Sequence, residues 1–297
     1  MRWDQFRRSD NVEDTRGQGG FPGGAGGAGG LGIGTIVVLG LIGWALGIDP
    51  RVLIQGAQDL NGTPRSQYET QKPVTPGTPS DRVGQFVAAI VGDTEDRWSE
   101  IFAQGGRTYS PPKLRLFSGA VESACGFARA ASGPFYCPKD RHVYLDTSFF
   151  DELERRFRGC QGKACEFAEA YVITHEVGHH VQNLLGVLPK ATEIQQSSDK
   201  ASANRVQVMI ELQADCFAGI WANHSQAKWK FIEPGDVEAA LQTAAAIGDD
   251  RLQQQSRGYV VPDSFTHGSS AQRARWFSNG LKSGAVSSCN TFEAAQL

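Results

Sequence analysis

The chain has 297 residues and a formal net charge of −3, from 29 lysines and arginines against 32 acidic residues. A near-neutral charge without a long basic run argues against general binding to nucleic acids or to anionic membrane surfaces. A soluble region of about 200 residues buries enough surface for an ordinary core, so neither a metal ion nor disulfides are needed merely for folding.

Glycine is concentrated near the N-terminus, where residues 17–34 hold many of the 35 glycines of the chain. A segment of this composition cannot bury a hydrophobic core and is typical of a flexible linker. We therefore interpret residues 1–30 as a flexible, Gly-rich N-terminal arm, with a specific recognition tail as the alternative.

Residues 31–48 read LGIGTIVVLGLIGWALGI and carry no charge. A membrane-spanning helix needs about 20 apolar residues, so this segment predicts a short transmembrane anchor. The alternatives are a buried core helix, which the missing polar face disfavours, and a cleaved signal peptide, for which the preceding arm is long. Because arginines precede the segment, the positive-inside rule places the N-terminus in the cytoplasm and the rest of the chain at the periplasmic or extracellular face.

Residues 49–80 are rich in proline, threonine and glutamine. The prolines forbid a regular helix, so we expect a tether between the anchor and a folded domain at residues 81–297. Asp81 is a suitable N-cap for the first helix of this domain, which carries Phe86 and Ile90 among apolar residues at helical spacing.

The remaining pattern predicts a mainly α domain with a small β-sheet, an α+β fold. Alternating residues indicate strands at 114–117 and 143–145, with a hairpin-like loop between them. We expect a loop around Pro189 and at residues 195–202. Helices are expected at residues 149–157, 164–185, 204–224 and 237–247, and from residue 269 or 270 to 280.

All six cysteines lie beyond the predicted anchor, and outside the cytoplasm such cysteines normally pair. Six cysteines allow 15 pairings. No Cys-x-x-Cys motif occurs, which argues against a zinc ribbon. Close spacing suggests Cys125 with Cys137 and Cys160 with Cys165, which leaves Cys216 with Cys289.

The run His175-Glu176-Val177-Gly178-His179 lies inside the helix predicted at residues 164–185. Residues four apart share one face of a helix, so His175 and His179 can bind one ion. Glu176 would lie beside a water whose pKa a zinc ion lowers toward ~7, and it could take the proton of that water during peptide hydrolysis. The apolar residues around the motif favour this interpretation over two histidines that serve only packing.

A catalytic zinc site needs a third protein ligand. The pattern His-Glu-x-x-His-x-x-Gly-x-x-His is excluded, because Gln182 and Leu185 stand where it requires Gly and His. Glu211 and Asp215 lie four residues apart in a predicted helix with apolar and small neighbours. We expect Glu211 to bind the zinc ion and Asp215 to accept a hydrogen bond from one of the ligand imidazoles. The alternative is an acidic pair on the surface of an amphipathic helix.

Further candidates lie outside these two helices. His267, in a loop just before a helix, could stabilise the oxyanion of peptide hydrolysis, and Arg273 could pair with an acid of the site. His180 is expected to point about 100° away from His179 and to be packed or solvated. Tyr144 and Tyr259 could also donate to an oxyanion, but no pattern selects them.

The sequence resembles the bacterial neutral zinc metallopeptidase family, whose members have a short N-terminal arm, one membrane segment and a helical metallopeptidase-like domain. The resemblance implies zinc ligands at His175, His179 and Glu211, a catalytic base at Glu176 and a zincin-like domain. Its Glu-x-x-x-Asp and Thr-His-x-x-x-x-x-Arg elements are also similar to those of membrane-embedded Glu-type zinc proteases, with Gly268 where that group usually has Pro. The matching segments are Met1–Trp3, Asn11–Asp14, Gly133–Pro138, Val143–Asp146, His175–His179, Glu211–Cys216, Ile247–Asp250 and Phe265–Ser269.

These features together predict a membrane-anchored zinc peptidase that acts on protein or peptide substrates and binds no nucleic acid. One alternative is a non-catalytic, chaperone-like or binding protein of the cell envelope that keeps zinc as a structural ion. A closed shell of four ligands, for example with His180 or His267 as the fourth, would favour that alternative. Another alternative is a disulfide-stabilised, adhesin-like domain without a metal.

Overall fold

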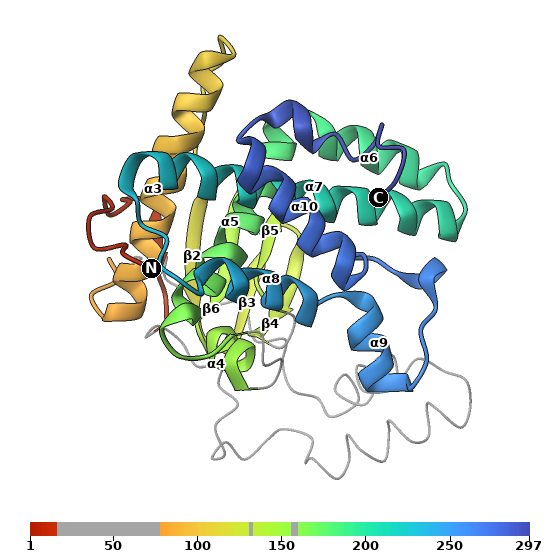
Figure 1. The fold of residues 1–297 in the computed structure, drawn as a ribbon, viewed down its shortest axis with the longest axis horizontal. Helices are drawn as coiled ribbons and strands as arrows, with labels where there is room; N and C mark the ends of the chain where they lie inside the picture. Colours follow the sequence, from red (N-terminus) through yellow and green to blue (C-terminus); the bar gives the residue numbers. More distant parts are fainter. Residues whose placement is uncertain (17–77, 131–132, 156–159) are drawn as a thin grey trace, which may run out of the picture. The chain divides into compact units, whose positions relative to one another are not determined.

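The computed structural model describes residues 1–16, 78–130, 133–155 and 160–297, and these residues confirm the mainly α fold with a small β-sheet (Figure 1). The expected anchor at residues 31–48 and nearly all of the expected tether lie outside the described residues. The strands are β1 Val12–Asp14, β2 Lys113–Phe117, β3 Ala120–Ser123, β4 Gly126–Arg129, β5 Phe135–Cys137 and β6 His142–Asp146. The helices are α3 Arg82–Gln104, α4 Ser148–Arg155, α5 Cys165–Leu184, α6 Val187–Gln196, α7 Lys200–Trp229, α8 Asp236–Ala246, α9 Asp249–Arg257 and α10 Ser270–Ser283, with short 3-10 turns at Gly162–Ala164, Pro262–Ser264 and Val286–Cys289.

The larger sheet has the strand order β1-β2-β6-β5. Strands β1, β2 and β6 run parallel, and β5 pairs antiparallel with β6 at one edge. Both predicted strands are therefore present, as β2 and β6. Leu114 and Leu116 of β2 and Val143 and Leu145 of β6 are all buried, because alternate residues of a strand point to the same face of a sheet.

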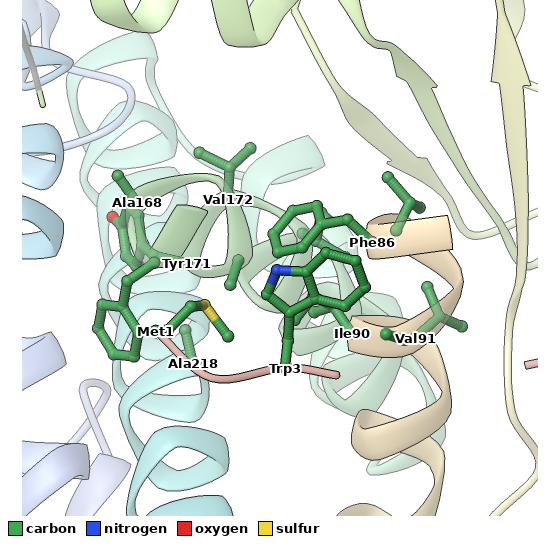
Figure 2. Close-up of a cluster of buried hydrophobic side chains, with 14 of the residues drawn as sticks. Met1, Trp3, Phe86, Ile90, Val91, Ala168, Tyr171, Val172 and Ala218 are labelled. Atoms are coloured by element: carbon green, nitrogen blue, oxygen red, sulfur yellow. The ribbon is translucent and has the colours of Figure 1, made fainter. Parts of the chain in front are cut away.

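The first sixteen residues belong to this folded unit, which corrects the expectation of a flexible arm for residues 1–16; the rest of the expected arm, residues 17–30, lies outside the described residues. Strand β1 pairs with β2, and Glu13 forms ion pairs with Lys113 at 2.8 Å and Arg115 at 2.7 Å. The side chains of Met1 and Trp3 are buried against α3 and α5 (Figure 2). A strand of three residues leaves no periodic signal in the sequence, and the glycine run that follows it dominates the local composition.

The pairing of β1 with β2 also bears on the predicted membrane topology. A bilayer cannot pass between two hydrogen-bonded strands, because their backbone groups would lose their partners in the hydrocarbon. Residues 12–14 and 113–117 must therefore lie on the same side of any membrane. A single crossing of the chain between residues 16 and 78 would separate them, but this segment lies outside the described residues, so the membrane topology stays a prediction. No helix among the described residues is long and apolar enough to cross a bilayer.

Asp81 caps α3 as predicted, since its side chain accepts a hydrogen bond from the backbone N–H of Gly84 at 3.0 Å. Two helical segments differ from the prediction. The expected loop around Pro189 is helix α6, in which the proline occupies the first turn, where a backbone N–H has no helical partner in any case. Helix α9 was not predicted, because Leu252 is its single apolar residue and no hydrophobic period marks it.

Small residues let the three helices behind the site approach closely. An added Cβ on Gly280 of α10 would lie 1.9 Å from the carbonyl oxygen of Cys216 in α7, so these two helices touch through their backbones. Figure 1 shows α10 alongside α7. An added Cβ on Gly178 of α5 would lie 3.1 Å from the Cα of Ala214 in α7. This contact brings the helix that carries His175 and His179 next to the helix that carries Glu211.

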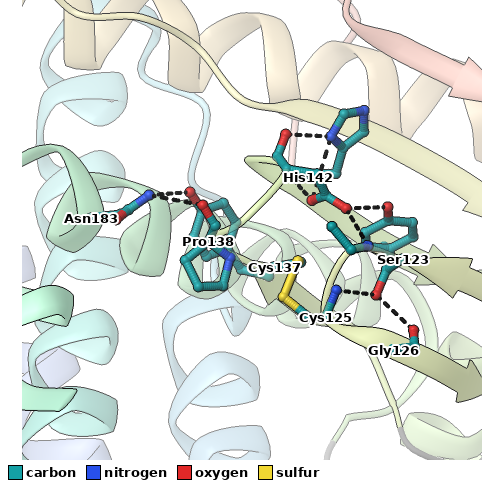
Figure 3. The surroundings of a disulfide bond; sticks show 11 residues. Ser123, Cys125, Gly126, Cys137, Pro138, His142 and Asn183 are labelled. Carbon is teal, nitrogen blue, oxygen red and sulfur yellow. Dashed lines mark hydrogen bonds and ion pairs between the residues drawn. A yellow bond between two sulfur atoms is a disulfide. The ribbon is translucent and has the colours of Figure 1, made fainter.

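All three suggested disulfides are present, and the described residues include no free cysteine. The bond between Cys125 and Cys137 ties the turn of the β3–β4 hairpin to the edge strand β5 (Figure 3). The bond between Cys216 and Cys289 ties α7 to the C-terminal segment. These two disulfides therefore fix β5 and α7, which both contribute residues to the predicted site.

Candidate metal centre

The two histidines of the motif project from α5 toward α7. Their ring centroids are 4.8 Å apart. His175 and Glu176 are buried, and the His179 side chain is 13% exposed. The helix around them is buried too, because the neighbouring Val172, Ile173 and Val177 pack into the core. The motif therefore sits on a rigid helix and opens to solvent mainly at His179.

Glu211 joins the two histidines from α7. One ligand atom each from His175, His179 and Glu211 lies within 4.8 Å of the others. Glu211 Oε2 is 3.2 Å from His175 Nε2 and 3.6 Å from His179 Nε2. The structure thus brings together the three side chains that the sequence suggested as metal ligands.

The Nδ1 atom of each imidazole, on the side of the ring away from Glu211, has a hydrogen-bond partner. Asp215 Oδ1 lies 2.8 Å from His175 Nδ1, so Asp215 has the predicted imidazole partner. Gln182 Oε1 lies 2.8 Å from His179 Nδ1. In the neutral form of each ring, which is the form that binds a metal ion, a hydrogen on Nδ1 leaves the lone pair of Nε2 directed at the space beside Glu211.

Asp215 is the centre of a buried polar network. Its carboxylate accepts two hydrogen bonds from Arg273, each 2.9 Å long, and one from the Tyr171 hydroxyl at 2.6 Å. Burial alone would raise the pKa of Asp215, but Arg273 and the adjacent His175 lower it to about 2. Arg273 therefore pairs with an acid of the site, as the sequence suggested, whereas Tyr171 carried no sequence signal.

The charges around the three ligand side chains favour a cation. Glu176, Glu211 and Asp215 supply three carboxyl groups here, and among the described residues that line the surrounding cleft one arginine, Arg273, supplies a positive charge. Burial would lower the pKa of His175, yet Asp215 and Glu211 raise it to about 10. Two imidazole nitrogens and one carboxylate oxygen are a common ligand set for catalytic zinc. The residues present therefore fit a zinc ion.

His267 lies in the same cleft and has a partner that the sequence analysis missed. Asp249, at the start of α9, accepts the backbone N–H of His267 at 2.5 Å and faces its Nδ1 at 3.3 Å. This hydrogen bond raises the pKa of His267, and burial opposes the shift. The signal for Asp249 was its place in the segment Ile247–Asp250, one of those that carry the family resemblance.

The cleft has a volume of about 590 Å³. Glu176 lines it, and no hydrogen bond or ion pair within the described part of the chain holds its carboxylate. The edge strand β5, α6 and α9 all contribute to the wall, which is mostly apolar. This wall includes Pro134, Phe135, Phe149, Leu188, Ile210 and Leu252.

Other candidates lie away from the three ligands. His180 is buried and faces the Tyr136 hydroxyl at 3.0 Å and the Ser110 carbonyl at 2.7 Å, which confirms that it is packed. Burial lowers the pKa of His180 to about 4. The Tyr144 hydroxyl donates to Asp140, and Tyr259 is 59% exposed; neither lines the cleft.

A family model described as "Putative neutral zinc metallopeptidase" matches residues 1–292. An uncharacterized protein of Escherichia coli K12, YpfJ, is 46% identical over 296 residues, which cover 98% of this chain and 99% of that protein. An uncharacterized protein of Mycobacterium tuberculosis H37Rv, Rv2575, is 41% identical over 262 residues, or 85% of each chain. No solved structure matches significantly.

Proposed function

The chain belongs to the neutral zinc metallopeptidase family, and from this premise we propose that it is a zinc-dependent peptidase that hydrolyses peptide bonds of protein or peptide substrates. One observation carries the proposal. The side chains of His175, His179 and Glu211 converge in a cleft, and beside them the carboxylate of Glu176 has no hydrogen-bond or ion-pair partner among the described residues.

His175, His179 and Glu211 would hold the zinc ion. When bound, zinc supplies a Lewis acid and lowers the pKa of a water to about 7. Glu176 then acts as the general base, because its carboxylate lines the cleft, has no other partner in the part of the chain that the structure describes, and can accept a proton. The same carboxyl group can pass that proton to the leaving amine.

His267 is the proposed donor to the oxyanion that forms when the scissile carbonyl is attacked. Its imidazole lines the cleft, and Asp249 holds its Nδ1 side, so the opposite nitrogen is available to a substrate. The hydrogen bond to Asp249 favours the protonated ring, which is the stronger donor. Asp249 is therefore a positioning residue in this mechanism.

The number of ligands bears on the alternative of a structural zinc site. Among the described residues, the metal-binding group has three members, and the His180 ring instead faces the Tyr136 hydroxyl and the Ser110 carbonyl. A catalytic zinc ion typically has three protein ligands and one open position, whereas a structural one has four. The three-membered group therefore supports the peptidase over a zinc-stabilised binding protein.

The location outside the cytoplasm is a separate proposal. Three disulfides in the described residues support it, because disulfides persist in oxidising compartments. We propose that residues 31–48 attach the chain to a membrane without a net crossing, so that β1 and the domain share one side. In spheroplasts, a reagent that does not cross the membrane should label single tags at residues 10 and 297 to the same extent. Opposite accessibility of the two tags would contradict the proposal.

Metal removal and reloading test the peptidase itself. We expect about one zinc per chain, loss of hydrolysis of a fluorogenic peptide library after treatment with a chelator, and recovery when zinc is added back. His175→Ala and Glu211→Ala should each weaken zinc binding and abolish hydrolysis. Hydrolysis that survives complete removal of zinc refutes the proposal, and zinc binding without hydrolysis of any peptide favours the binding-protein alternative.

A further inference from the structure

His179 is connected to the C-terminal segment by a chain of buried amide hydrogen bonds. We propose that Gln182 and Gln213 are positioning residues that fix His179 in the tautomer with hydrogen on Nδ1, which leaves Nε2 to face Glu211. The inference rests on the proposed metal-binding role of His179. It assigns a function to the position where the three-histidine pattern has glycine.

Three hydrogen bonds connect His179 to a backbone carbonyl of the C-terminal segment. His179 Nδ1 is 2.8 Å from Gln182 Oε1. Gln182 Nε2 donates to Gln213 Oε1 at 3.0 Å, and Gln213 Nε2 donates to the Cys289 carbonyl oxygen at 2.9 Å. Gln182 also donates to the carbonyl oxygen of Ile210 at 2.8 Å.

The direction of every link follows from the two backbone carbonyls. A carbonyl oxygen can only accept, so Gln213 must present its NH2 group to Cys289 and its oxygen to Gln182. Gln182 must likewise present its NH2 group to Ile210 and Gln213, which uses both hydrogens. Its oxygen is then left for His179, and an oxygen facing Nδ1 requires a hydrogen on that nitrogen. The tautomer of His179 is thus set by groups that cannot reverse their polarity.

The row of hydrogen bonds from His179 to Cys289 is also buried and firmly anchored. Gln182 and Cys289 are fully buried, and Gln213 is 7% exposed. The disulfide from Cys289 to Cys216 anchors the terminal carbonyl to α7, and the Thr291 hydroxyl donates to the Met209 carbonyl of the same helix at 2.7 Å. A buried amide that loses its partner has no water to replace it, so one change disturbs the whole chain.

The two histidines are therefore oriented by different chemistry. Asp215, an ionised carboxylate, faces Nδ1 of His175, and a neutral amide faces Nδ1 of His179. An ionised acceptor makes its imidazole more basic, and a neutral acceptor mainly fixes the angle of the ring. Losing Gln182 should thus weaken metal binding without adding or removing a charge.

The test compares zinc affinity in Gln182→Met with a matched control. Methionine is similar in size to glutamine and makes no comparable hydrogen bond, so we expect the zinc dissociation constant to rise by about 10-fold or more. The control is Asn223→Leu, which removes a hydrogen bond of 2.8 Å to the Leu281 carbonyl away from the site. It should lower the melting temperature and leave the zinc dissociation constant within about twofold of the wild type.

A spectroscopic readout separates positioning from general stability. In zinc-loaded protein labelled with ¹⁵N-histidine, the Nδ1 proton of His179 should be detected in the wild type and in the control, and lost to exchange in Gln182→Met. If that variant does not fold, Gln213→Met interrupts the chain one link further away and should shift both readouts in the same direction.

The outcomes distinguish this inference from the proposed function. Unchanged zinc affinity together with a retained Nδ1 proton in Gln182→Met overturns the positioning role while leaving the peptidase intact. A wild-type protein that binds no zinc overturns the proposed function and this inference with it.

Discussion

Removal of Arg273 tests the buried network that holds His175. Arg273 and Asp215 have exposed side-chain fractions of 3% and 0%. The guanidinium makes two hydrogen bonds of 2.9 Å to Asp215 and one of 3.2 Å to Tyr171. Arg273→Met would leave the Asp215 carboxylate buried with its main counter-charge missing, which typically costs about 3–5 kcal/mol. For a domain of this size the melting temperature should fall by roughly 6–20 °C.

A double-mutant cycle isolates the pair from its surroundings. Asp215→Asn alone should also destabilise the fold, because it leaves Arg273 without its partner. The double variant, Asp215→Asn with Arg273→Met, removes both charges and should be more stable than the sum of the single changes predicts, by about 1–3 kcal/mol. Urea unfolding in the presence of a chelator measures this coupling without a contribution from bound metal. Changes that add to within about 0.5 kcal/mol would refute the account of this network.

Three other predictions address the N-terminal residues, the proposed oxyanion donor and a partly buried acid. Trp3→Ala should destabilise the fold by about 3–5 kcal/mol in urea unfolding, because the ring is 4% exposed and packs on Phe86; a change below about 1 kcal/mol would show that residues 1–16 are not part of the core. Asp249 raises the pKa of His267, so the protonated ring persists above pH 6.5 and is lost as pH rises through the raised value. The alkaline limb of kcat/KM should therefore move to lower pH in Asp249→Asn, and a limb that stays in place contradicts the role of His267. Burial, with neighbouring acidic groups, raises the pKa of Glu169 to about 8, so the wild type loses stability as pH rises from about 4.5 to 8. Glu169→Gln removes this loss. In urea unfolding, the free energy of unfolding of the variant minus that of the wild type should therefore be larger at pH 8 than at pH 5. An equal difference at both pH values would contradict the raised pKa of Glu169.

The sequence predicted the parts of the site that follow from local helical geometry. The four-residue spacing of His175 and His179, and of Glu211 and Asp215, fixes which side chains share a helix face whatever the tertiary structure. The two helices then meet through Gly178 and Ala214, and that contact turns two separate patterns into one site.

Partners brought together by tertiary structure were not readable in this way. Asp249 reaches His267 across 18 residues, through a short helix without an apolar period. In the sequence, Gln182 stands out only as a mismatch to the three-histidine pattern. Its hydrogen bonds depend on the packing of α5 against α7 and on the position of the C-terminal segment. The spacing of residues in the sequence does not show which partners the oxygen and the NH2 group of a glutamine amide will face.

The N-terminal segment shows a different limit of sequence reasoning. Composition predicts that the glycine run is unsuited to a core, and that run lies outside the described residues; the three residues of β1, just before it, are too few for a pattern to reveal. Their pairing with β2 joins two parts of the chain that the predicted topology placed on opposite sides of a membrane. The membrane topology was predicted mainly from residues 31–48, whereas the pairing that bears on it is made by residues before and after this segment.

The central claim is that Glu176 acts as the general base at a zinc site. Glu176→Gln keeps the shape of the side chain and removes its ability to accept a proton. The most direct measurement compares this variant with the wild type for zinc content and for hydrolysis of one fluorogenic peptide. The account predicts equal zinc content and a rate lower by roughly 10²–10⁴-fold. Equal rates at equal zinc content would contradict it.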